Sequence, residues 1–110
     1  MFDSVGTDNF SSEVLRGKMP VLLASIRRDY DYKEQTRVLE GVSKEYVERL
    51  KVCLLDENST GTFRKCGIDG SPAFVIFYGG TEKGRMLGKA DRGTLSKFVS
   101  GILSSLPSGQ

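Results

Sequence analysis

The sequence predicts a single small α/β domain, built as a helix–sheet–helix sandwich. A chain of 110 residues with 38 % hydrophobic content is long enough to bury one core. Apolar runs typical of buried strands alternate with segments whose apolar residues recur at helical spacing. Near the end, a glycine-rich turn between two strand patterns indicates a hairpin. We assign residues 1–106 to this domain and expect 107–110 to form a frayed tail.

A short helix and a buried strand are expected first. Capping side chains at residues 7–9 precede apolar residues with the spacing of one helix face, and Gly17 ends this pattern. The run from Val21 to Ile26 is mostly apolar, which is typical of a strand covered on both faces in a parallel sheet. A central strand is therefore predicted there.

A long core-facing helix of about four to five turns follows. Asp31 with Glu34 three residues later resembles a capping box, so Asp31 is predicted to be the N-cap. Gly41 lies inside the helix, where glycine costs about 1 kcal/mol relative to alanine. The apolar positions at helical spacing are Val38, Leu39, Val42, Tyr46, Val47 and Leu50.

The second half of the chain is expected to complete the sheet. Strands are predicted at 51–55 and 73–78, with a short helix between them at about 60–65. Gly79-Gly80 and Gly84 mark a turn into a weaker strand at 85–87. The last predicted element is a helix capped by Asp91, with its apolar residues at Leu95, Phe98, Val99, Ile102 and Leu103.

The composition excludes several kinds of catalytic site. The chain has no histidine, so it has no Ser-His-Asp triad, Cys-His pair or histidine-liganded zinc, and its two cysteines cannot form a four-cysteine zinc site. We interpret Asp56-Glu57 as turn residues rather than as a paired acid site. The glycines at 79–84 are interpreted as hairpin residues, because no Lys-Ser/Thr of a phosphate loop follows them. No metal or cofactor is expected.

Charge and hydropathy patterning predict the kind of partner and the compartment of the protein. The net charge is +2, with both signs interspersed, so neither nucleic acid nor an anionic membrane surface is an expected partner. No apolar run approaches the roughly 18 residues of a membrane span. The acidic start of the chain does not resemble a signal peptide, so a cytoplasmic protein with reduced thiols is predicted.

The order of elements and several short strings resemble the thioredoxin family from about Thr7 to Leu103. This resemblance implies a three-layer α/β/α sandwich, with a mixed central sheet and a C-terminal hairpin and helix. The strings that carry it are Thr7-Asp8-Asn9-Phe10, Lys44-Glu45-Tyr46, Lys51-Val52, Asp56-Glu57-Asn58, Cys66-Gly67-Ile68-Asp69-Gly70-Ser71-Pro72-Ala73-Phe74 and Gly88-Lys89-Ala90-Asp91.

The redox site of that family is missing from this sequence. The family carries C-x-x-C at the N-terminus of its long helix, where the helix dipole favours the thiolate. The equivalent stretch is 29–32 or 30–33 here, and neither contains cysteine. The buried Asp of the preceding strand falls at or near Ala24, and Arg27-Arg28 replaces the Trp-rich approach to the motif. Dithiol catalysis is therefore not expected.

A peptide-binding groove is predicted in the same place. Ser71-Pro72 resembles the family's X-cis-Pro turn, whose backbone binds an extended peptide by β-augmentation. The resemblance implies a groove lined by Tyr30, Asp31, Tyr32, Ser71, Pro72, Gly88 and Lys89. Tyr30 and Tyr32 lie beside Arg27 and Arg28, and tyrosine and arginine are enriched at binding hot spots. A solvated loop with one tyrosine packed on the helix explains the two tyrosines as well.

The two thiols lie away from the motif. Cys53 is expected to be a small buried hydrophobe within a strand. Two interpretations of Cys66 stay open, an inert residue or a partly exposed reactive thiol. A Cys53–Cys66 disulfide is not expected in a cytoplasmic chain.

Two functions are consistent with the sequence. The first is a redox-inactive module that binds a protein or extended peptide, as an adaptor, an assembly chaperone or a complex subunit. Thioredoxin-like accessory proteins of hydrogenase maturation also lack the cysteine pair, and their P-A-T-x-x-x-F-x-G-G stretch is similar to residues 72–80 here. The alternative is a thiol-disulfide oxidoreductase in redox homeostasis that exchanges disulfides through Cys66 alone.

Overall fold

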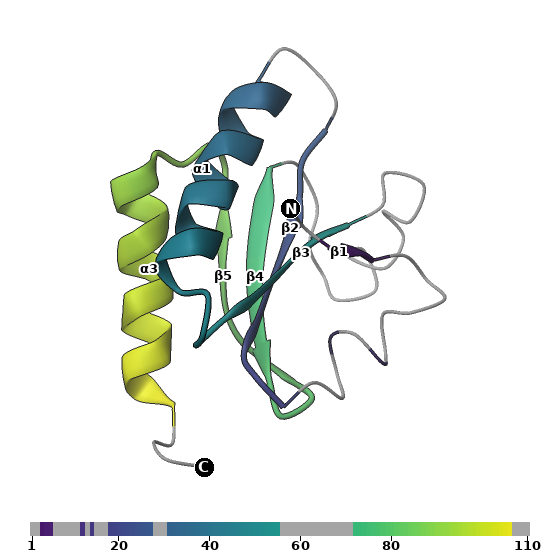
Figure 1. Cartoon of the computed structure of the whole chain (residues 1–110), viewed down its shortest axis with the longest axis vertical. Coiled ribbons are helices and arrows are strands. Elements are labelled where there is room, and N and C mark those ends of the chain that lie inside the picture. Colours follow the sequence, from purple (N-terminus) through teal and green to yellow (C-terminus); the bar gives the residue numbers. More distant parts are fainter. Residues whose placement is uncertain are drawn as a thin grey trace.

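The computed structural model describes residues 3–5, 12, 14, 18–27, 31–55 and 72–106. Within these ranges the chain forms an α/β domain with one mixed sheet in the order β1-β3-β2-β4-β5. Two helices lie side by side along the same face of that sheet (Figure 1). The elements are β1 (Asp3–Val5), β2 (Val21–Ser25), α1 (Tyr32–Glu45), β3 (Lys51–Leu55), β4 (Ala73–Tyr78), β5 (Thr81–Leu87) and α3 (Arg92–Ser105).

The sheet combines a parallel part with a hairpin. Strands β2 and β3 are parallel and joined through α1, and β4 and β5 form an antiparallel hairpin, both as predicted. Strand β4 also pairs antiparallel with β2, which joins the two parts into one mixed sheet. Strand β1, which pairs parallel to β3 at the edge of the sheet, was not predicted. Its three residues are too few to show the alternation by which a strand is recognised.

Side chains of the central strands point alternately to the two faces of the sheet. Residues on both faces are buried. We call the two sets of buried residues the helix-side cluster and the opposite-side cluster. The helix-side cluster contains Leu22, Ala24, Ile26, Leu39, Val42, Tyr46, Leu50, Val52, Phe74, Ile76, Ala90, Leu95 and Val99. The opposite-side cluster contains Val14, Val21, Leu23, Cys53, Leu55, Ala73, Val75 and Phe77.

The long helix begins where predicted but ends early. Asp31 occupies the N-cap position, yet its side chain makes no capping hydrogen bond, so the predicted capping box is wrong. Its backbone has helical dihedrals (φ −87°, ψ −7°), whereas a capping side chain needs an extended N-cap. At the other end Tyr46 leaves the helical conformation. Val47 therefore does not continue the apolar face, and it is 68 % exposed, contrary to prediction.

The hairpin turn is tighter than predicted. Gly79 and Gly80 both have positive φ (63° and 82°), as a two-residue turn between twisted strands requires, and β5 begins directly at Thr81. Gly84 is therefore not a turn residue but lies inside β5. A Cβ atom at Gly84 would lie 2.6 Å from Cδ1 of Ile102, so glycine allows α3 to approach the strand closely.

Substitution of Gly84 tests this close approach. We expect Gly84→Ala to lower the free energy of unfolding by about 1–2 kcal/mol through overpacking. Ile102→Val removes the Cδ1 atom that the new methyl group would meet. In that background the added cost of Gly84→Ala should nearly disappear, which a double-mutant cycle in urea measures. Strictly additive effects would contradict the proposed packing.

The final helix is capped as predicted. The Thr94 N–H donates to Asp91 Oδ1 over 2.7 Å, and this hydrogen bond is the main reason that the pKa of Asp91 is lowered below its ordinary 3.8. Of the five predicted apolar residues, Leu95 and Val99 are fully buried. Phe98, Ile102 and Leu103 are partly buried and pack against the helix-side cluster.

The cap predicts a pH dependence. A carboxyl group with a lowered pKa in the folded state stabilises the protein above pH 3.8, and this contribution is lost as the pH falls through the folded pKa. Asparagine also caps helices but has no such charge. As the solution is acidified, the free energy of unfolding of the wild type should therefore fall relative to that of Asp91→Asn. Urea unfolding at several acidic pH values measures it, and parallel curves would contradict the assignment.

Several predicted elements lie outside the described residues. These are the short helix at 60–65, the tail at 107–110 and the first helix apart from Ser12 and Val14. Neither described helix is long and apolar enough to cross a membrane.

Candidate functional site

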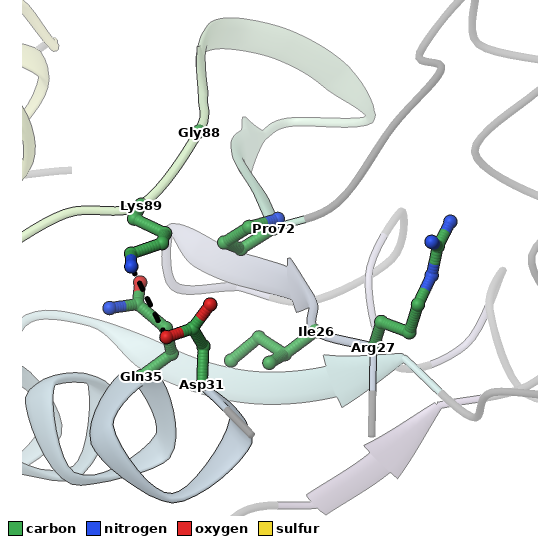
Figure 2. Close-up of a pocket in the computed structure, with 7 residues that line it drawn as sticks. All are labelled: Ile26, Arg27, Asp31, Gln35, Pro72, Gly88 and Lys89. Atoms are coloured by element: carbon green, nitrogen blue, oxygen red, sulfur yellow. Dashed lines mark hydrogen bonds and ion pairs between the residues drawn. The ribbon is translucent and has the colours of Figure 1, made fainter. Parts of the chain in front are cut away.

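A cavity of about 270 Å³ lies where three strand ends meet the start of α1 (Figure 2). The strand register explains this meeting. Ser25, the last residue of β2, pairs with Ala73, the first residue of β4, and Ala73 pairs with Leu87, the last residue of β5. The segments beyond these strand ends therefore reach the same edge of the sheet. The cavity is lined by Ile26, Arg27, Asp31, Gln35, Pro72, Gly88 and Lys89.

An ion pair closes one side of the cavity. Lys89 Nζ lies 3.2 Å from Asp31 Oδ1, and Figure 2 shows the two side chains meeting between α1 and the segment after β5. The Lys89 side chain is 55 % exposed and that of Asp31 is 25 % exposed. Instead of capping α1, the Asp31 carboxylate thus links the start of the helix to the segment that leads into α3.

A buried amide makes the second link between the same two segments. Gln35 Nε2 donates to the Ala90 carbonyl oxygen, and the Ala90 N–H donates to Gln35 Oε1, both over 3.1 Å. The Gln35 side chain is buried, and these two bonds satisfy both of its polar ends. The Gln35 side chain therefore pairs with both backbone polar groups of Ala90 and fixes the segment that precedes α3.

The segment after β5 has a third attachment at the cavity. The Gly88 N–H donates to the Pro72 carbonyl oxygen over 2.9 Å. Gly88 has a φ of 96°, a conformation that residues with a Cβ rarely adopt. The backbone from 88 to 90 is therefore held by Pro72 and Gln35, independently of the ion pair.

The structure brings together four of the predicted groove residues, namely Asp31, Pro72, Gly88 and Lys89. Tyr32 is half-buried and packs against the helix-side cluster rather than lining the cavity. Tyr30, Ser71 and the candidate thiol Cys66 lie outside the described residues.

Two lining residues, Ile26 and Gln35, were not predicted to lie at a binding surface, and Arg27 was predicted only as a neighbour of the two tyrosines. Gln35 left a recognisable signal, because it continues the buried helix face of Leu39, Val42 and Tyr46 with a polar side chain. A polar residue at an apolar position needs a buried partner.

The lining of the cavity combines charged and polar groups. The described residues around the cavity offer a carboxylate, an ammonium, a guanidinium and an amide, and they include neither a thiol nor a hydroxyl group. Within the same described ranges, no three acidic or cysteine side chains gather as metal ligands would. Cys53 is fully buried in the opposite-side cluster, away from the lining. Comparison of the chain with models of known protein families and with curated proteins finds no match.

Proposed function

We propose that this chain is a thioredoxin-like domain that binds a protein or extended peptide and does not catalyse dithiol exchange. The observation that carries the proposal is the Asp31–Lys89 ion pair at the start of α1. The resemblance to thioredoxins assigns that place to the redox cysteines, where the helix dipole favours a negative charge. Here the Asp31 carboxylate, paired with the Lys89 ammonium group, occupies it.

The strand order supports the thioredoxin-like part of the proposal. The central position of β2, its parallel pairing with β3 and the antiparallel hairpin of β4 and β5 agree with the mixed sheet that the resemblance implies. Both described helices lie on one face, and the opposite-side cluster is buried as well. A sheet buried on both faces is the hallmark of a three-layer sandwich.

The size of the cavity supports a peptide rather than a large cofactor. Ligand pockets for drug-sized molecules usually have about 300–1,000 Å³, and this cavity has about 270 Å³. It therefore suits one or two amino-acid side chains of a longer segment. The preformed backbone at Gly88 gives such a segment a rigid wall, which limits the entropy lost on binding.

Two measurements test the proposal together. The protein should not accelerate insulin disulfide reduction above background. A photo-crosslinking p-benzoylphenylalanine introduced at Arg27, which lines the cavity, should capture binders selected from a displayed library of random peptides. The same group at Lys97, an exposed position on α3, is the matched control. Insulin turnover that is lost in Cys66→Ser would instead support monothiol exchange, and equal crosslinking at both positions would exclude the cavity as the site.

Alkylation of Cys53 provides a further check. Because this side chain is fully buried, N-ethylmaleimide should leave it unmodified in the native protein and label it after unfolding in urea. Mass spectrometry of tryptic peptides separates Cys53 from Cys66. Rapid native labelling of Cys53 would contradict its place in the opposite-side cluster.

A further inference from the structure

We propose that the partner binds through a carboxylate, which replaces Asp31 as the ion-pair partner of Lys89. The ion pair between Asp31 and Lys89 would then exist only in the free protein. The inference rests on the proposed function, because it names the chemistry of the segment that the same cavity takes. It concerns a side-chain exchange, and no covalent bond forms or breaks.

The exposure of the pair makes exchange possible. Lys89 is 55 % exposed and Asp31 is 25 % exposed, so the ammonium group is accessible from solvent while its partner lies closer to the protein. Ion pairs between partly exposed groups are weak, since water screens them and ordering two side chains opposes them. A carboxylate brought by a bound peptide can therefore compete with Asp31 for Lys89.

The backbone around Lys89 does not depend on this ion pair. Gly88 on one side donates to Pro72, and Ala90 on the other side exchanges two hydrogen bonds with Gln35. The Lys89 backbone therefore keeps its position when Asp31 is displaced. Such an arrangement keeps the cation ready for a new partner without rebuilding the cavity wall.

The charges and the apolar surface of the cavity define the segment that fits. Its lining includes two cationic side chains, Arg27 and Lys89, and one carboxylate, Asp31. Ile26 and Pro72 lie between the two cationic residues in Figure 2 and supply apolar surface. An extended segment that alternates acidic and apolar side chains complements this pattern, because opposite charges across an interface select the partner.

Fluorescence anisotropy with two labelled peptides tests the exchange. The acidic probe is Gly-Val-Glu-Val-Glu-Val-Gly, and in the control probe glutamine replaces both glutamates. We expect the acidic peptide to bind about tenfold more tightly than the control, and Lys89→Ala to remove most of that difference. Asp31→Asn should tighten binding of the acidic peptide by about two- to threefold, because the competitor is gone. Lys97→Ala, on α3, should leave both affinities unchanged.

The outcomes separate this inference from the proposed function. Equal binding of both peptides, or weaker binding of the acidic peptide to Asp31→Asn, would overturn the exchange while leaving a peptide-binding module in place. Failure of both the library and the defined peptides to bind would reject the proposed function together with the inference.

Discussion

Replacing Gln35 by leucine is expected to lower the free energy of unfolding by about 2–4 kcal/mol, because each buried polar group left without a partner costs about 1–3 kcal/mol. The Gln35 amide satisfies both the N–H and the carbonyl oxygen of Ala90, and leucine can satisfy neither. For a domain of this size the loss corresponds to a fall in Tm of roughly 10–20 °C. Calorimetry and urea unfolding of the two proteins measure it.

A second variant distinguishes the lost hydrogen bonds from a change of packing. Gln35→Glu nearly preserves the shape, and its protonated carboxyl group can both donate to and accept from Ala90. Burial raises the pKa of such a carboxyl group. Its stabilising effect is present below the unfolded pKa of about 4.3 and is lost as the pH rises through the raised folded pKa. Gln35→Glu should therefore approach wild type in acid and fall behind it at neutral pH, whereas a constant deficit would contradict the paired hydrogen bonds.

Much of the sheet could be predicted from the sequence because its strands are strongly patterned. The runs at 51–55 and 73–78 were predicted with the observed bounds, since residues buried on both faces leave an unbroken apolar signal.

The end of α1 could not be predicted in this way. Val47 has the helical spacing of a core residue, but the chain leaves the helix at Tyr46, so the spacing no longer describes where Val47 points.

The candidate site was only partly predictable, because it depends on pairs that are distant in sequence. The resemblance identified Asp31 and Lys89 separately as groove residues, but their ion pair spans 58 positions. Asp31 with Glu34 matches a capping box locally, and the tertiary contact with Lys89 prevails over that local pattern. Gln35 and Ala90 are 55 positions apart, and their hydrogen bonds follow from the packing of α1 beside α3.

The helix-side cluster should depend most strongly on its fully buried side chains. Leu39→Ala is expected to cost about 2–5 kcal/mol, because it removes apolar contacts and leaves a cavity between α1 and the sheet. Alanine is a good helix former, so the loss reflects packing rather than helix propensity. Leu87→Ala makes the same chemical change on β5 at a residue that is 56 % exposed, and it should cost well under about 1 kcal/mol.

This comparison also bears on the cavity. Leu87 ends the strand that leads to Gly88 and Lys89, so a large effect of Leu87→Ala would mean that this end of β5 relies on apolar packing. The observed contacts instead attach the segment through Pro72, Asp31 and Gln35. We therefore expect Leu87→Ala to retain wild-type binding of the acidic peptide.

Leu39→Ala should also retain wild-type binding of the acidic peptide at temperatures below its lowered Tm, because Leu39 does not line the cavity. Urea unfolding and anisotropy on the same two variants measure both expectations, and similar unfolding free energies for them would contradict the assigned core.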